Sequence, residues 1–182
     1  MIASVSPGAS AAVSPEPTPP SLEGTLVQSQ CVDGIPWVVY DVKLVDPDGL
    51  SADDGTATFT FTAAAHPGES FVTTVPLGAG SLLWPGASAE PNEDGSFTAT
   101  NWPGYTPDVD GWAAVGDENY GWTRDGVDVT IEVDTSMTVS LAYPAPSELC
   151  VAAPPIELHA ELHAELDAPP ATSVEAEAQF AG

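Results

Sequence analysis

The clearest alternation of hydrophobic and polar residues lies between positions 127 and 143. Hydrophobic side chains occupy every second position as Val127, Val129, Ile131 and Val133, and after a short break as Met137, Val139, Leu141 and Tyr143. Successive side chains of a strand point to opposite faces of a sheet, so each half predicts a strand with one buried face. The polar residues Thr135 and Ser136 separate the halves, which predicts a hairpin.

The same alternation predicts further strands upstream. A strong strand is expected from Trp37 to Asp46, with Val38, Tyr40, Val42 and Leu44 on one face, and another from Thr56 to Ala64, with Ala57, Phe59, Phe61 and Ala63 inward. Further strands are predicted at residues 25–32, 71–77, 82–84 and 97–102, and two short ones in the stretch 112–124, around 116–119. Pro76 cannot donate a ladder hydrogen bond, so the strand 71–77 is expected at a sheet edge.

Asp-Gly pairs separate many of these segments, at positions 33, 48, 54, 94, 110 and 125. Glycine supplies the positive φ angle that tight turns require. Many short strands joined by such turns, without a helical period, are typical of an antiparallel β-sandwich. The sequence therefore predicts an all-β domain over residues 25–150.

The flanking segments have a different composition. Residues 1–24 are rich in Ala, Ser and Pro and have too little apolar surface to offset the entropy of ordering, so a disordered linker is predicted. Residues 151–182 form an acidic low-complexity tail, in which 156–168 repeats Glu-Leu-His-Ala. Its four-residue period is compatible with helix and with strand. Residues 174–180 alternate again and are interpreted as the start of another repeat.

Charge limits the classes of partner. The chain of 182 residues has 27 acidic residues against two basic ones, Lys43 and Arg124, for a net charge of −25. Nucleic-acid binding requires several cations to displace counterions, so nucleic acid is excluded as a partner. Anionic membrane surfaces are disfavoured for the same reason, and no segment is apolar enough for membrane insertion. Cations, cationic peptides, glycans and proteins, including extracellular ligands and other surface-protein repeats, remain as partners.

The two cysteines, Cys31 and Cys150, lie at the two ends of the predicted domain. This position favours a disulfide that joins the first strand to the last, and with it an oxidising compartment. On the chain-entropy model, closing so long a loop contributes about 4–5 kcal/mol. The alternative is a pair of buried free thiols.

Tryptophans are the candidate ligand-binding residues. The tripeptide Trp-Pro-Gly occurs twice, at Trp84 and Trp102, and Trp112 follows a third turn signal. Aromatic faces on a β-sandwich can stack on sugar rings, so these three residues form a candidate carbohydrate-binding site. The alternative is that they pack beneath the loops at the ends of the sandwich.

Metal and catalytic signatures are weak. Asp46, Asp48, Asp53 and Asp54 are close together and raise calcium as an alternative to ordinary turn chemistry, but the EF-hand spacing fails because position 57 is alanine. His159 and His163 lack the glutamate that a zinc protease places directly after its first histidine. No nucleophile elbow is present. We therefore predict no cofactor and no catalytic residues.

An ordered set of short motifs resembles the immunoglobulin-like repeat modules of actinobacterial cell-surface and wall-anchored proteins. The set comprises Cys31-Val32-Asp33, Pro36-Trp37-Val38-Val39-Tyr40, Asp46-Pro47-Asp48-Gly49, Leu83-Trp84-Pro85-Gly86-Ala87, Asn101-Trp102-Pro103-Gly104, Trp122-Thr123-Arg124, Tyr143-Pro144 and Cys150. The resemblance covers residues 25–150. It implies an immunoglobulin-like sandwich at the cell surface, with a structural or adhesive function as a spacer or display domain and no enzymatic activity.

Overall fold

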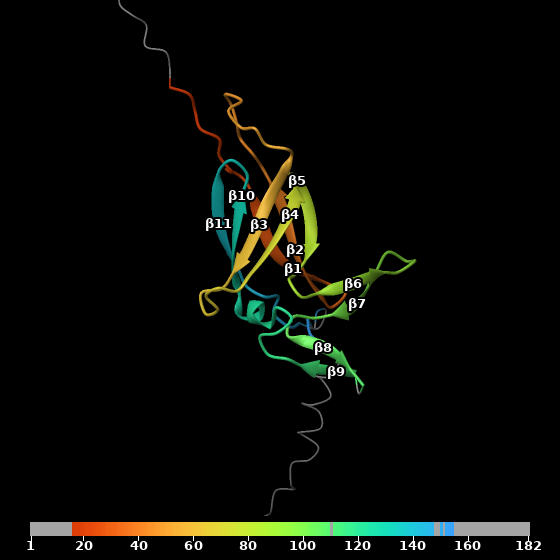
Figure 1. Cartoon of the computed structure of the whole chain (residues 1–182). Helices are drawn as coiled ribbons and strands as arrows, with labels where there is room; N and C mark the ends of the chain where they lie inside the picture. The colour runs from red at the N-terminus through yellow and green to blue at the C-terminus, as the bar shows by residue number, and fades with distance from the viewer. Residues whose placement is uncertain (1–15, 110, 148–149, 151, 155–182) are drawn as a thin grey trace, which may run out of the picture.

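A computed structural model describes residues 16–109, 111–147, 150 and 152–154 of the chain (Figure 1). Regular structure in this part is β-strand apart from one short 3₁₀ helix. The elements are β1 (Leu26–Val32), β2 (Ile35–Val42), β3 (Thr56–Thr62), β4 (Ser70–Pro76), β5 (Gly78–Leu83), β6 (Ser88–Pro91), β7 (Phe97–Asn101), β8 (Tyr105–Asp108), β9 (Gly111–Ala114), the 3₁₀ helix η1 (Gly121–Asp125), β10 (Val127–Glu132) and β11 (Ser136–Leu141).

Seven of these strands form a two-layer sandwich. One sheet has the order β1-β2-β5 and the other the order β11-β10-β3-β4, and all neighbours in each sheet are antiparallel. Contacts between β1 and β11 and between β4 and β5 close the two long sides of the sandwich. The predicted all-β, antiparallel, immunoglobulin-like sandwich is confirmed.

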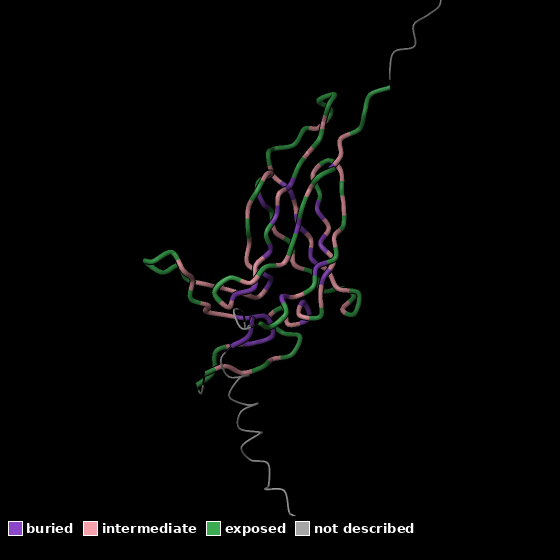
Figure 2. The backbone as a smooth tube through the Cα atoms, turned by 180° about the vertical axis from the view of Figure 1, so that it is seen from behind, coloured by how far each residue is buried: buried purple, intermediate pink, exposed green. Residues whose placement is uncertain are grey.

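The core lies between the layers and follows the alternation in the sequence. Val38 of one sheet and the cross-strand pair Phe59 and Ile131 of the other are all 0% exposed. Figure 2 shows buried residues at intervals along the strands of both sheets, separated by intermediate and exposed ones. Transfer of these side chains from water is the main favourable term for such a fold, at about 25 cal/mol per Å² of apolar surface. The hairpin predicted at 127–143 corresponds to β10 and β11, paired from Val127–Leu141 to Glu132–Ser136.

Turn and edge predictions are also confirmed. Every glycine of the six Asp-Gly pairs has a positive φ angle. Between β1 and β2, Asp33 and Gly34 have φ angles of 54° and 75°, as expected for a two-residue hairpin turn. Strand β4 lies at the edge of its sheet, and Pro76 is its last residue.

A second group of elements follows β5 and precedes β10 in the chain, and it covers one end of the sandwich. The hairpins β6–β7 and β8–β9 project from that end, and η1 lies beside them (Figure 1). Of the two short strands predicted in the stretch 112–124, one corresponds in part to β9, and the other is wrong, because residues 116–120 form a turn followed by η1. Gly116, Asn119 and Tyr120 all have positive φ angles, which a strand does not accommodate.

The folded part extends beyond both predicted boundaries. Leu22, assigned to the linker, is 6% exposed and packs in the core, and Ser21 exchanges backbone hydrogen bonds of 2.9 and 2.8 Å with Val45. At the other end Ala152 and Ala153 are 2% and 7% exposed. Amino-acid composition describes a segment as a whole, so it does not reveal single buried residues at its end. The rest of the predicted linker (1–15), the repeat at 156–168 and the alternating segment 174–180 lie outside the described residues.

No helix in the part of the chain that the structure describes is long and apolar enough to span a bilayer.

Candidate functional site

A disulfide joins the first strand to the segment that follows the last strand. Cys31, near the end of β1, is bonded to Cys150 with the two Cα atoms 5.8 Å apart. The predicted disulfide is confirmed. Cys150 is 5% exposed, and its backbone exchanges hydrogen bonds of 2.6 and 3.1 Å with Ser147. The cross-link therefore lies in a packed and hydrogen-bonded part of the molecule.

The segment after Cys150 is attached to the end of the sandwich. The Tyr143 hydroxyl donates a hydrogen bond of 2.7 Å to the Ala152 carbonyl. Burial raises the pKa of Tyr143 well above its usual range, and the nearby charge of Arg124 opposes this shift only in part. The Arg124 guanidinium carbon lies 5.1 Å from the ring centre of Tyr105 and 5.8 Å from that of Tyr143. Such cation–π contacts typically contribute about 0.5–2 kcal/mol.

The two Trp-Pro-Gly tripeptides form the same turn. The amide of Ala87 donates to the carbonyl of Trp84 (2.9 Å), and that of Tyr105 donates to the carbonyl of Trp102 (3.1 Å). Proline at the second position and a positive-φ glycine at the third are typical of a type II turn. Gly86 and Gly104 have φ angles of 85° and 78°.

Asn119 joins these two turns. Its side-chain amide nitrogen donates hydrogen bonds to the Trp102 carbonyl (2.9 Å) and the Tyr105 carbonyl (2.8 Å) in one turn, and to the Gly86 carbonyl (3.4 Å) in the other. Asn119 adopts φ 48°, a left-handed conformation that asparagine tolerates better than most residues. The loop before η1 thus holds both turns in one rigid unit.

Two of the three candidate tryptophans are buried. Trp84 is 0% exposed, and its indole nitrogen donates a buried hydrogen bond of 2.8 Å to the Thr123 hydroxyl. Trp102 is 7% exposed and packs edge-to-face on Trp112, with ring centres 5.0 Å apart. Trp84 and Trp102 therefore follow the alternative given above, in which the tryptophans pack beneath the loops, and packing covers the ring faces that a sugar would need. Trp112 is half-buried and is the only one of the three with surface on the outside.

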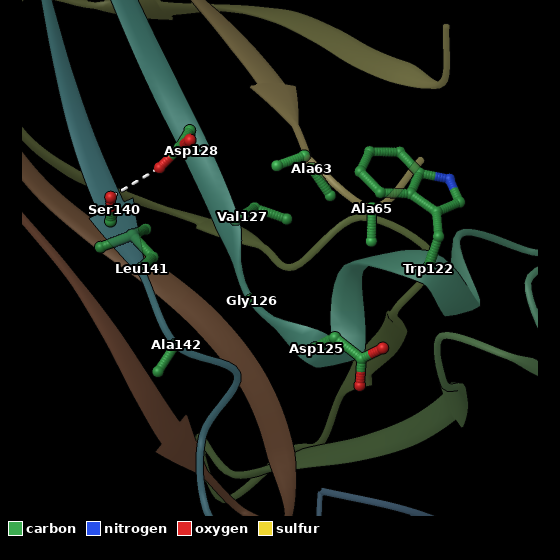
Figure 3. A pocket seen from close by; sticks show the side chains of 11 residues that line it. Ala63, Ala65, Trp122, Asp125, Gly126, Val127, Asp128, Ser140, Leu141 and Ala142 are labelled. Atoms are coloured by element: carbon green, nitrogen blue, oxygen red, sulfur yellow. Dashed lines mark hydrogen bonds between the residues drawn. The ribbon is translucent and has the colours of Figure 1, made fainter. Parts of the chain in front are cut away.

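An open hollow of about 600 Å³ lies beside η1 (Figure 3). Its walls are mainly apolar and include Ala63, Ala65 and the Trp122 ring. The Asp128 carboxylate at its side accepts a hydrogen bond of 2.6 Å from the Ser140 hydroxyl, so this oxygen is already engaged. The hollow is lined by alanine methyl groups, the Trp122 ring and the Asp125 and Asp128 carboxylates.

The acidic cluster after β2 is occupied by turn contacts. The two Asp46 carboxylate oxygens accept hydrogen bonds from the amides of Leu50 (2.9 Å) and Ser51 (2.8 Å). Asp53 accepts one from Gly55 (2.8 Å). Among the described residues, no group of three or more His, Cys, Asp or Glu side chains converges as a metal site would require. The calcium alternative therefore gains no support from this loop.

Of the three histidines, His66 lies in the part of the chain that the structure describes. Its Nδ1 is 3.8 Å from the Asp117 carboxylate and its ring centre is 6.5 Å from that of Trp122. His159 and His163 lie outside the described residues. The sequence does not reveal the roles of Asn119 and Thr123. Their hydrogen-bond partners lie between 14 and 39 positions away along the chain, and only the Thr123 bond to Tyr120 is local.

Comparison with known proteins adds no relative: no protein-family model, no curated protein and no solved structure matches this chain.

Proposed function

We propose that this chain is a non-catalytic module of an extracellular bacterial surface protein, acting as a spacer or display domain. The observation that carries the proposal is the Cys31–Cys150 disulfide, which closes the folded unit at the point where the chain leaves it. Disulfides persist in oxidising compartments, which are mainly extracellular. An excess of negative charge, −25 for the chain, favours solubility and opposes association between copies.

The path of the chain supports a role as a spacer. The described chain enters at one pole of the sandwich, beside the Ser21–Val45 bridge, and leaves at the opposite pole beside η1 (Figure 1). A domain with its two ends at opposite poles adds its full length to the separation of whatever flanks it. The flanking Pro-rich composition supports the same role, because proline favours extended chain.

The packing of the aromatic residues supports a structural role over sugar binding. Trp84 and Trp102 belong to the turn unit that Asn119 holds together, and their rings are covered. Trp112 alone presents a half-buried ring, whereas a stacking site on a sandwich usually needs a broader exposed platform. The carbohydrate-binding alternative is therefore an outcome for the experiment to exclude.

A two-part experiment tests this function. Intact cells of the source organism are treated with a membrane-impermeant maleimide, with and without an impermeant reductant. We expect Cys31 and Cys150 to be labelled only after reduction, because the protein is outside the cell and oxidised. The purified chain is then applied to a glycan array beside the Trp112→Ala variant, and we expect no saturable binding from either.

Two results would overturn the proposal. One is a protein protected from the maleimide until the cells are permeabilised. The other is a glycan bound by the wild-type chain and lost on the Trp112→Ala change, which would make the chain a carbohydrate-binding module.

A further inference from the structure

The disulfide lies on the shortest covalent path between the two ends of the module. From the Ser21–Val45 bridge at one pole the chain runs through Leu22 into β1, which ends beside Cys31 at the other pole. There the disulfide passes directly to Cys150, and Ala152 to Pro154 follow as the exit. Figure 1 shows the described chain leaving at this pole, opposite the point of entry.

We infer that tension applied to the two ends passes along β1 and through the Cys31–Cys150 bond, and bypasses β2 to β11. This inference rests on the proposed function as a spacer between flanking segments. The remaining ten strands lie inside the covalent loop that the disulfide closes, and they carry no tension. No force along the chain can separate them from one another while the bond is intact.

The geometry makes the oxidised module nearly inextensible. Among the described residues, 16–30 and 152–154 lie outside the loop, and β1 is already extended, with a rise close to the maximum for a polypeptide. Straightening the turn at residues 22–25 and the exit segment 152–154 releases less than about 30 Å. The loop itself separates its ends by 119 positions, so opening it frees about 400 Å. One covalent bond therefore changes the extensibility of the module by more than about tenfold.

Strand β1 is also well suited to transmit tension. It pairs with β2 over seven consecutive residues, from Leu26–Asp41 to Val32–Ile35. After the disulfide is cleaved, tension along β1 loads these hydrogen bonds together in shear. Val27 is 7% exposed and anchors the strand to the core, and Leu22 does the same at the point of entry. Tension thus reaches the cysteine through a strand that is held along its whole length.

The test is a force-clamp measurement on the full 182-residue chain, held by handles at its two ends. Without reductant we expect no step longer than about 30 Å. Dithiothreitol is then added: its thiolate attacks one cysteine sulfur, forms a mixed disulfide with it and releases the other cysteine as a thiolate. We expect a short step at cleavage, followed after a delay by release of the rest of the 400 Å, with a delay that shortens as the force rises.

The delay is the decisive quantity, because it shows that the core was folded until the bond broke. Release of the whole length at the moment of cleavage, with no delay at any force, would mean that tension had already unfolded the strands inside the loop. A step of about 400 Å without reductant would mean that the bond does not close the loop. Either result overturns the inference.

The Cys31→Ser/Cys150→Ser variant is the matched control. If it folds, it should give the long step without reductant. If it does not fold, it should extend smoothly like an unfolded chain, and the comparison of oxidised and reduced wild-type molecules still decides the question. The measurement does not depend on where the protein is found, so a failure of the surface-labelling experiment would be distinguishable from a failure here.

Discussion

Thr123 is the buried polar residue of the described core, at 0% exposed. Its hydroxyl donates to the Tyr120 carbonyl (2.7 Å) and accepts the hydrogen bond from the Trp84 indole (2.8 Å). A buried tryptophan usually needs such a partner, because an unpaired N–H away from water is costly. One threonine hydroxyl thus allows the largest core side chain to be fully buried.

We expect the Thr123→Val change to lower the free energy of unfolding by about 1–3 kcal/mol, because it leaves the Trp84 N–H unpaired in the core. Thr138→Val is the matched control, since it removes an exposed hydroxyl contact to Thr130 and should cost less than about 1 kcal/mol. Urea denaturation of the oxidised proteins measures both changes. Equal losses in the free energy of unfolding for the two variants would show that the buried hydrogen bond contributes no more than the exposed one.

At the scale of the elements, one loop determines the shape of the disulfide end. Asn119 holds the two Trp-Pro-Gly turns together, and Gly121 packs closely against the backbone of Gly116 and Gly104. A Cβ at Gly121 would collide with the Gly116 carbonyl oxygen and lie 2.8 Å from the Gly104 Cα atom. These are backbone atoms that cannot move aside, so only glycine allows this approach.

We predict that Asn119→Gly loosens both Trp-Pro-Gly turns, with a cost of about 1–3 kcal/mol from the carbonyls left without donors. Glycine accepts the left-handed φ, so this variant isolates the amide, and Asn119→Ala should cost more because alanine adds backbone strain. Hydrogen exchange should accelerate at Ala87 and Tyr105 together. Faster exchange at positions next to 119 alone would contradict the role of Asn119 as the link.

The β10–β11 turn is joined to the loop after β2 by one carboxylate. Asp134 accepts hydrogen bonds from the Ser51 hydroxyl (2.5 Å) and the Ala52 amide (2.7 Å). These contacts lower the pKa of Asp134 in the folded protein, and the hydrogen bond from the Ser51 hydroxyl has the largest effect. The folded protein therefore binds this proton less tightly than the unfolded chain. The stability from this contact is complete above the unfolded-state pKa of about 3.9 and is lost as the pH falls through the folded-state value.

Asp134→Asn should therefore flatten the loss of stability on acidification below about pH 3.9. Glu93→Gln, an exposed carboxylate in the β6–β7 hairpin, removes the same charge without this contact and serves as the control. Thermal denaturation from neutral to acid pH measures the slope for each protein. If the two variants follow the same pH dependence, the Asp134 contact does not contribute.

The sequence predicts the sandwich well and its disulfide end poorly, for a physical reason. Strands β2, β3 and β10 have period-two burial along their length, a local signal that a reader can find in the residues. Strands β6 and β8 have four residues each and contain Pro91 and Pro107, so no alternation is visible. The contacts of Asn119 and Thr123 join residues far apart in the chain. Only the fold brings these partners together, which is why the sequence left two alternatives open for the tryptophans.

At the scale of the whole molecule, the disulfide should supply a large share of the stability. We expect the Cys31→Ser/Cys150→Ser variant to lose about 4–5 kcal/mol on the chain-entropy model, out of the 5–15 kcal/mol typical of a domain. Urea denaturation compares it with the oxidised wild type, and reduced wild-type protein should match the variant. An oxidised protein no more stable than the variant would show that the cross-link only joins segments already fixed by packing.

The central claim is a single sandwich whose first strand and exit segment are covalently joined, and trypsin tests it most directly. Lys43 and Arg124 are the only basic residues, so trypsin cuts the denatured, thiol-blocked chain into residues 1–43, 44–124 and 125–182. Without reduction, mass spectrometry should show 1–43 joined to 125–182, with 44–124 free. Three separate peptides before any reductant is added would contradict the account.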